Sequence, residues 1–408
     1  MTKETIQKKT PDPTARLLPL FAFWCLFNMG TNFAHPVTPT YIIERGLDSS
    51  MFGMAYAAAM FTMFLVAPFW GQLCNYLPTR SIALISCLGY GLGQFFFLMA
   101  YSNAAMIAAR LFAGCFTSGA FVAVSNYIVN TAAGAKDRGR NLTVYATIQG
   151  VAGAVGYFAA GMLGVIRTEI PLTCQIFILS GSGIGMYFLM VDDTAYKQVP
   201  DKKLSLRDVN PLAAFLKAGE FMNATLLLLF LATGFSVLGQ VCLEQVFQYY
   251  LKAHFGLPSS YNGTIKAVLA ISGLAVNSLV TMRLMKSKHL EKVLLPVLLG
   301  MTVPMCMIFV FHSFYPLVIC YLLVNLVYTV RSPLLQNLTA NSGTPRTSNL
   351  LMGMYQSIGY IGSCLGGLFS GSLYNVNELL PFYVAAVMLA VSCICAWLYG
   401  RRAGKQLL

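Results

Sequence analysis

Long apolar runs separated by short polar segments dominate this sequence. A helix needs about 20 mostly apolar residues to cross the hydrocarbon core of a bilayer, and twelve runs reach adequate length. They lie near residues 17–43, 51–76, 81–101, 104–131, 141–166, 171–190, 222–251, 260–284, 291–312, 314–341, 348–375 and 379–400. Single Gly, Pro or charged residues interrupt several of them, which spanning helices tolerate. The pattern predicts an all-α membrane protein with twelve transmembrane helices.

Polar segments divide these runs into two sets of six. The longest polar segment follows the sixth run, and shorter ones begin and end the chain. Within the longest one, Asp192 and Asp193 stand close to several lysines, which predicts a solvated hinge. The expected organisation is a cytoplasmic lead at 1–16, a six-helix bundle at 17–190, a cytoplasmic linker at 191–220, a second six-helix bundle at 221–400 and a cytoplasmic tail at 401–408.

The basic residues predict how the spans are oriented. The chain has 27 Lys and Arg against 14 Asp and Glu, a net charge of +13. If the N-terminus is cytoplasmic, 21 of the basic residues fall in cytoplasmic segments, 3 in outer loops and 3 within spans. Short cytoplasmic loops are enriched in Lys and Arg. We therefore expect both termini inside, and we interpret the basic excess as a topology signal, not a nucleic-acid surface.

Composition excludes several classes of protein. Hydrophobic residues make up 57% of the chain and charged residues 10%, against about 25% charged in soluble domains. A soluble enzyme, a nucleic-acid binder and a disordered scaffold are excluded. The eleven cysteines lie mostly in apolar runs without zinc-ligand spacing, so we expect packing roles, no metal and no cofactor. The first run is too long for a cleaved signal, which predicts a multi-pass protein of the cell (cytoplasmic) membrane.

An internal repeat relates the two halves. Five identities appear within nineteen positions when the sequence is shifted by 210 residues, and they pair Tyr145 with Tyr355, Ile148 with Ile358, Gly156 with Gly366, Gly161 with Gly371 and Leu163 with Leu373. Glycines let helices approach closely in lipid. The matching glycines therefore predict two equivalent tight helix contacts, either as plain packing or as seams about which two bundles rock.

Two related six-helix halves joined by a central loop resemble the major facilitator superfamily. Four segments are similar to its twelve-span drug:proton antiporter group. Residues 71–80 resemble G-x-L-a-D-R-x-G-R-K, with Asn75 in place of the acid; residues 110–114 resemble R-x-x-x-G; residues 150–164 resemble the antiporter glycine motif, with Tyr157 in place of Pro; and residues 35–39 resemble a P-x-x-P exit. The resemblance implies alternating access, with conformational roles for Gly71, Asn75, Arg80, Gly156, Gly161, Gly366 and Gly371.

Four charged residues lie well within spans, where charges are costly and usually face a cavity or a partner. Arg110 is expected either to bond backbone carbonyls of the first two spans or to line a cavity. Glu244 is the one deep carboxylate, and it either forms an ion pair with Lys266 or carries a proton. Arg331 would give the second half a fixed positive charge that favours anionic or zwitterionic cargo.

A polar stripe marks the first span. Asn28, Thr31, Asn32, His35 and Thr38 have helical spacing that would keep them on one face of a helix. Lipid would penalise that face, so we expect it to line a central cavity. His35 is either a satisfied hydrogen-bonding group or a proton switch. The resemblance would also lead one to expect an acidic residue in this span, and residues 17–43 contain none.

The predicted substrate cavity draws on both halves, with Glu244 and His35 as the proton-coupling candidates. Its lining comprises Asn28, Thr31, Asn32, His35, Arg110, Asn126, Tyr145, Gln149, Gln240, Glu244, Gln248, Asn325, Tyr328, Arg331, Tyr355 and Gln356.

These features favour a secondary transporter that exports a small organic molecule by alternating access, coupled to protons, and acts as a monomer in the lipid bilayer. A sugar, nucleoside or other metabolite symporter or uniporter of the same fold is the alternative. A membrane-bound transferase or lipid-handling scaffold is a remote third class, because an enzyme would need a His/Asp or paired-carboxylate cluster at a membrane face. The sequence also lacks the G-x-x-x-x-G-K-[ST] loop that direct use of ATP requires.

Overall fold

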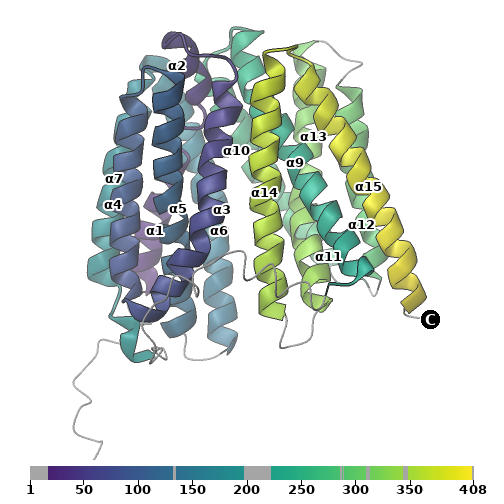
Figure 1. Ribbon diagram of the computed structural model, residues 1–408, viewed down its shortest axis with the longest axis horizontal. Helices are drawn as coiled ribbons and strands as arrows, with labels where there is room; N and C mark the ends of the chain where they lie inside the picture. The colour runs from purple at the N-terminus through teal and green to yellow at the C-terminus, as the bar shows by residue number, and fades with distance from the viewer. Residues whose placement is uncertain are drawn as a thin grey trace, which may run out of the picture.

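The computed structural model describes residues 17–131, 135–196, 222–284, 287, 289–308, 313–342 and 348–406, and it contains no strand within these ranges. The first half of the chain forms a set of helices that pack side by side (Figure 1). They are α1 (Leu17–Thr31), α2 (Thr38–Glu44), α3 (Met51–Tyr76), α4 (Thr79–Leu98), α5 (Asn103–Thr131), α6 (Ala135–Ile166), α7 (Glu169–Leu189) and the short 3-10 helix η2 (Asp193–Tyr196).

The second half forms a matching set beside the first, drawn in green to yellow in Figure 1. Its elements are α9 (Ala224–Ala253), α10 (Ser259–Val276), a π-helical turn η3 (Asn277–Thr281), α11 (Met282–Leu284), α12 (Leu290–Met307), α13 (Phe314–Asn341), α14 (Ser348–Tyr374) and α15 (Leu380–Gln406). The π-turn interrupts the predicted eighth span near its end. Helix α2 lies at one end of the molecule and the C-terminal end of α15 at the other.

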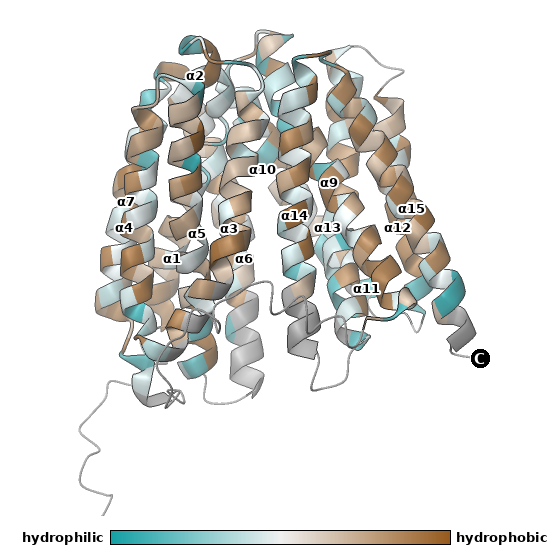
Figure 2. Ribbon diagram, in the orientation of Figure 1, coloured by the Kyte–Doolittle hydropathy of each residue, from teal (hydrophilic) through white to brown (hydrophobic). Residues whose placement is uncertain are grey.

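Ten of the described helices are long and apolar enough to cross a membrane. Helix α1 is apolar but has 15 residues, and α14, with 27 residues, is not among the ten. Hydrophobic residues, in brown, recur along the helices (Figure 2), and many large apolar side chains are exposed. Phe177, Phe188 and Ile271, for example, are each 72% exposed. Such a surface suits lipid, so this is a multi-pass membrane protein; the count of twelve spans stays a prediction.

The first predicted span is not one continuous helix. Helix α1 ends at Thr31, residues 32–37 form turns, and α2 begins at Thr38. Pro36 and Pro39 lie at this break, and proline both lacks an N–H donor and restricts the residue before it. The expectation that Asn28 to Thr38 share one helical face is therefore wrong, and His35 lies in the break instead.

The 210-residue offset also relates backbone features that lie beyond the five sequence identities. It places Gly46, in the turn before α3, on Gly256, in the turn before α10. Both residues have left-handed φ values, +61° and +66°. Glycine adopts this conformation without the steric penalty that other residues incur, so the two halves use the same turn at the same place.

Glycines let the two halves pack closely near the α2 end. A Cβ on Gly53 of α3 would lie 2.5 Å from the backbone nitrogen of Gly371 on α14, and a Cβ on Gly161 of α6 would lie 3.0 Å from Cα of Gly263 on α10. The offset of 210 relates Gly53 to Gly263 and Gly161 to Gly371. Two pseudo-equivalent seams therefore join the halves, and we call them the glycine seams.

The other two motif glycines make matching contacts inside each half. Gly156 of α6 packs on the backbone of Met29 in α1, and Gly366 of α14 packs on the backbone of Leu238 in α9. A Cβ on Gly71 would meet no described atom within 4 Å, so the described contacts give no close approach that would explain this glycine. The side chain of Asn75 lies outside the described residues.

Asp192 and Asp193 do not form a solvated hinge. Asp193 is fully buried; its carboxylate accepts hydrogen bonds from the Thr79 backbone N–H (2.9 Å) and the Asn130 side chain (2.7 Å). Thr79 is the first residue of α4, where unpaired N–H groups and the helix dipole attract an anion. Asp192 pairs with Arg80 at 3.0 Å. The start of the predicted linker is thus fastened to the first half.

Candidate functional site

Three neighbouring pockets form one chamber between the two halves. All three include Tyr56 of α3 in their lining. We name them after a charged residue in each: the Arg110 pocket (about 190 Å³), the Glu244 pocket (about 420 Å³) and the Arg331 pocket (about 280 Å³). Helices α1 to α6 of the first half and α9, α10, α13 and α14 of the second contribute lining residues.

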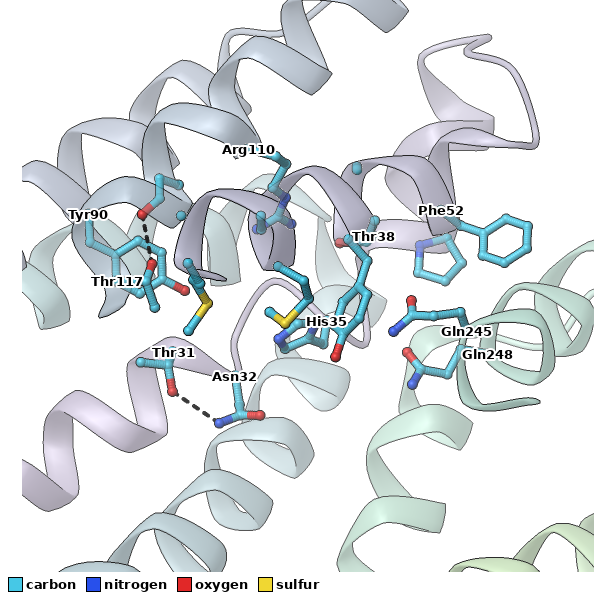
Figure 3. Close-up of a pocket in the computed structure, with 18 of the residues that line it drawn as sticks. Thr31, Asn32, His35, Thr38, Phe52, Tyr90, Arg110, Thr117, Gln245 and Gln248 are labelled. Atoms are coloured by element: carbon cyan, nitrogen blue, oxygen red, sulfur yellow. Dashed lines mark hydrogen bonds between the residues drawn. The ribbon is translucent and has the colours of Figure 1, made fainter. Parts of the chain in front are cut away.

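The Arg110 pocket lies close to the break between α1 and α2. In Figure 3, the Arg110 side chain extends from α5 toward the space around His35, Asn32 and Thr38. These three polar side chains, at and beside the break, line the pocket. The apolar wall of the Arg110 pocket comprises Ala55, Ala59, Met60, Met63, Ala113 and Phe121. The pocket therefore combines one cation with a largely apolar surface.

The Glu244 pocket contains a half-buried ion pair. Glu244 Oε1 on α9 contacts Lys266 Nζ on α10, and the two side chains are 28% and 19% exposed. Both residues also line the pocket. Of the two alternatives posed by the sequence, the ion pair is present. Glu244 also lines the chamber, and its proton-carrying role stays a prediction.

A chain of hydrogen bonds connects this ion pair to the other half of the molecule. Gln248 Nε2, one helical turn along α9, donates to Glu244 Oε1 at 3.4 Å. The Tyr157 hydroxyl on α6 donates to Gln248 Oε1 at 2.5 Å. His35 stacks on the Tyr157 ring, with centroids 6.1 Å apart and planes within 5°. The ion pair is thus coupled to a contact between the halves, close to the seam formed by Gly161 and Gly263.

Arg331 is buried and bonded to neutral groups. Its Nε donates to Ser236 Oγ at 2.8 Å and its Nη2 to the Thr233 carbonyl at 3.1 Å, and the guanidinium lies 4.9 Å from the Tyr328 ring centroid. It is 1% exposed. These bonds hold α13 against α9 and satisfy much of the guanidinium.

Most of the sequence-predicted cavity residues lie on these pockets. They are Thr31, Asn32, His35, Arg110, Gln149, Glu244, Gln248, Asn325, Tyr328, Arg331, Tyr355 and Gln356. The other four predicted residues lie outside the three linings and bond within their own halves: Asn28 donates to the Trp24 carbonyl, Asn126 to the Val122 carbonyl, Tyr145 to the Phe121 carbonyl and Gln240 to Asn325.

Sequence reasoning missed several lining residues. Tyr56 lines all three pockets, Gln245 lines two, and Tyr157 supplies the hydrogen bond between the halves. Gln245 follows Glu244 directly, and Tyr157 replaces the proline of the glycine motif, so both positions carried a signal. Tyr56 stands in an apolar run and carried none.

No group of three or more His, Cys, Asp or Glu gathers at any point in the described ranges. The eleven cysteines are all free thiols, and six of them are buried.

Comparison with known proteins identifies the architecture. The family model described as Major Facilitator Superfamily matches residues 20–289. The quinolone resistance protein NorA of Staphylococcus aureus is similar, with 26% identity over 89 residues, which is 22% of this chain and 23% of NorA. The chain thus aligns with less than a quarter of the length of this curated relative.

Solved structures of transporters share the fold over almost the whole chain. A bacterial homologue of the iron transporter ferroportin, in an inward-facing state, gives a TM-score of 0.71 at 15% identity, covering 95% of this chain and 99% of that one. The human organic anion transporter MFSD10 (TETRAN) gives 0.67 at 17% identity, covering 95% and 100%. The nucleoside transporter NupG gives 0.67 at 14% identity, covering 94% and 98%. At such identities the likeness concerns the fold.

Proposed function

Because this chain belongs to the major facilitator superfamily, we propose that it is a secondary transporter that exports a small organic molecule by alternating access, driven by protons. The superfamily consists of transporters and not of enzymes. The similarity to NorA favours export of a drug-like compound, whereas the likeness to nucleoside and iron transporters concerns the fold and does not identify a substrate.

The observation that supports this proposal most is that residues of both halves line one chamber. The glycine seams, the close contacts between the halves described above, lie at the α2 end of that chamber. There the glycine seams bring α3 against α14 and α6 against α10. Further from that end, Gly150 of α6 and Gly359 of α14 line the chamber, and a Cβ added to either would meet no described atom within 4 Å. Two bundles that rock about a central site would close one end while the other opens.

The distribution of basic residues supports a direction for this opening. If both termini are cytoplasmic, as the Lys and Arg count predicts, the α2 end faces outward and the chamber opens to the cytoplasm. The structure would then represent an inward-facing state. We further propose that the division into two bundles joined by the 191–220 linker describes the moving parts.

The contacts around Glu244 suggest how protons couple to this motion. A proton on Glu244 would remove its negative charge and weaken the ion pair with Lys266. The positive charge of Lys266 would then lack a partner in a poorly solvated site, which is costly. Gln248 would then lose its charged acceptor, and the Tyr157–Gln248 bond between the halves would become easier to break. His35, stacked on Tyr157, is the second candidate proton site.

The test is transport into proteoliposomes with and without an imposed pH gradient, using norfloxacin, ethidium, uridine and glucose as probes. Glu244→Gln should abolish uphill accumulation but preserve exchange of the same probe down its own gradient, which also shows that the variant is folded. Glu169→Gln, at an exposed pair with Arg167, is the matched control. Undiminished uphill transport by Glu244→Gln would refute the coupling role, and transport insensitive to the pH gradient would refute proton drive.

A further inference from the structure

Arg110 is a buried cation without an anionic partner. It is 8% exposed and lines the Arg110 pocket. Its guanidinium carbon lies 3.9 Å above the Phe97 ring centroid. No described residue forms an ion pair or a hydrogen bond with it, so the expected bonds to carbonyls of the first two spans are absent from the described part of the chain.

The other two cations of the chamber are satisfied. Lys266 is paired with Glu244, and Arg331 donates to Ser236 and to the Thr233 carbonyl. The lining of the Arg110 pocket contains no acidic residue. Glu244 is the one acidic residue that lines any of the three pockets, and it pairs with Lys266. The described side chains therefore offer Arg110 no counterion.

The surroundings of the Arg110 guanidinium are unfavourable for its charge unless a bound ligand supplies a counterion. Removing a charge from water is costly when no opposite charge or hydrogen bond replaces the lost hydration. A ring face compensates part of this cost but accepts no hydrogen bond. The guanidinium presents donors in a planar fork that matches the two oxygens of a carboxylate.

The rest of the pocket restricts the kind of anion. Met60, Met63 and Phe121 form an apolar wall beside Arg110, and Thr38 and Thr117 add hydroxyl groups at its edge. The Thr38 hydroxyl donates to the Ala34 carbonyl in the break, and the Thr117 hydroxyl donates to the Ala113 carbonyl in α5. Neither residue therefore supplies Arg110 with charge. A small hydrophilic anion would leave the apolar wall unused.

Building on the proposed transport function, we propose that Arg110 is the anchor for the carboxylate of an amphipathic organic anion whose apolar body lies against Met60, Met63 and Phe121. The carboxylate oxygens accept hydrogen bonds from the guanidinium N–H groups, and the side chains of the apolar wall exclude water from the resulting ion pair. Arg331 is less suited to this role, because two of its donors already bond Ser236 and the Thr233 carbonyl.

The test compares matched probes that differ in charge alone. Binding of phenylbutyrate, naphthylacetate and pyrenebutyrate to the purified full chain is measured by calorimetry beside the amide and the amine of each compound. At least one carboxylate should bind about 10- to 100-fold more tightly than its amide, as expected for charge-assisted hydrogen bonds in a buried site. Arg110→Gln should reduce that carboxylate to the affinity of its amide and leave the amide unchanged, which also reports folding.

Two further variants sharpen the assignment. Arg110→Lys keeps the charge but loses the fork, so it should retain part of the preference. Arg167→Gln, which removes an exposed arginine paired with Glu169, should retain all of it. The inference is overturned if no carboxylate binds more tightly than its amide, if nothing binds, or if Arg110→Gln keeps the preference.

These outcomes are separable from failure of the proposed function. Proton-driven transport of neutral or cationic probes without any carboxylate preference would remove the anion subsite and leave the transporter assignment standing. If the carboxylate preference depends on Arg110 but transport does not respond to the pH gradient, the anion subsite stands and proton-driven transport is refuted.

Discussion

Replacing Gly53 by alanine should shift the equilibrium between the two states of the chamber. A Cβ at this position would lie 2.5 Å from the Gly371 backbone nitrogen, whereas ordinary contact begins at 3.4 Å. The same Cβ would lie still closer to the Gly367 carbonyl oxygen. Helices α3 and α14 would have to separate by about 1 Å, because these two atoms belong to the backbone and no side-chain rotation can move them. Overpacking of this kind costs about 1–3 kcal/mol, and this cost applies to the state in which the seam is closed.

That cost corresponds to a shift of about 5- to 150-fold away from closure at the α2 end. Hydrogen exchange followed by mass spectrometry measures it on the unlabelled protein, in peptides covering residues 45–54 and 371–378. Amides in both peptides should exchange faster in Gly53→Ala than in the wild type, because the α2 end opens more often.

Two matched variants set the scale. Gly263→Ala, at the pseudo-equivalent position, would place its Cβ 3.1 Å from the Tyr157 carbonyl oxygen and should have a smaller effect. Gly181→Ala lies on an exposed face of α7 with nothing within 4 Å and should have none. Unchanged exchange in Gly53→Ala, or an effect of Gly181→Ala of equal size, would refute the idea that the glycine seams control opening.

The remaining predictions concern the contacts that position the chamber. Asp193→Ala should lower the free energy of unfolding by about 1–3 kcal/mol, because it leaves the buried Thr79 N–H and the half-buried Asn130 amide without this acceptor. Asp192→Ala should cost less than about 1 kcal/mol, since its pair with Arg80 is partly exposed; equal losses in chemical unfolding would contradict this difference. Tyr157→Phe removes the hydroxyl that bonds Gln248 across the halves and should speed exchange in the same α2-end peptides, and an unaltered rate would show that this bond does not hold the halves together.

Much of the fold follows from one-dimensional patterns. Lipid solvates apolar side chains and leaves backbone groups no partner outside the helix, so long apolar runs had to become helices. The matching glycines of the 210-residue repeat predicted equivalent tight helix contacts in the two halves. The structure has them: Gly161 and Gly371 make one equivalent pair of contacts, and Gly156 and Gly366 make another. The break at residues 32–37 could have been predicted from Pro36 and Pro39, but the spacing of the polar stripe suggested a continuous helix.

The sequence determined that Arg110, Glu244, Lys266 and Arg331 would be buried charges, because apolar runs surround each of them. It could not determine which of them had partners, since a partner is a matter of distance between helices far apart in the chain. The tertiary structure decided that Lys266 reaches Glu244, that Ser236 and Thr233 satisfy Arg331, and that the described residues leave Arg110 without an anion. Burial is set by composition along the chain, but electrostatic compensation is set by packing in space.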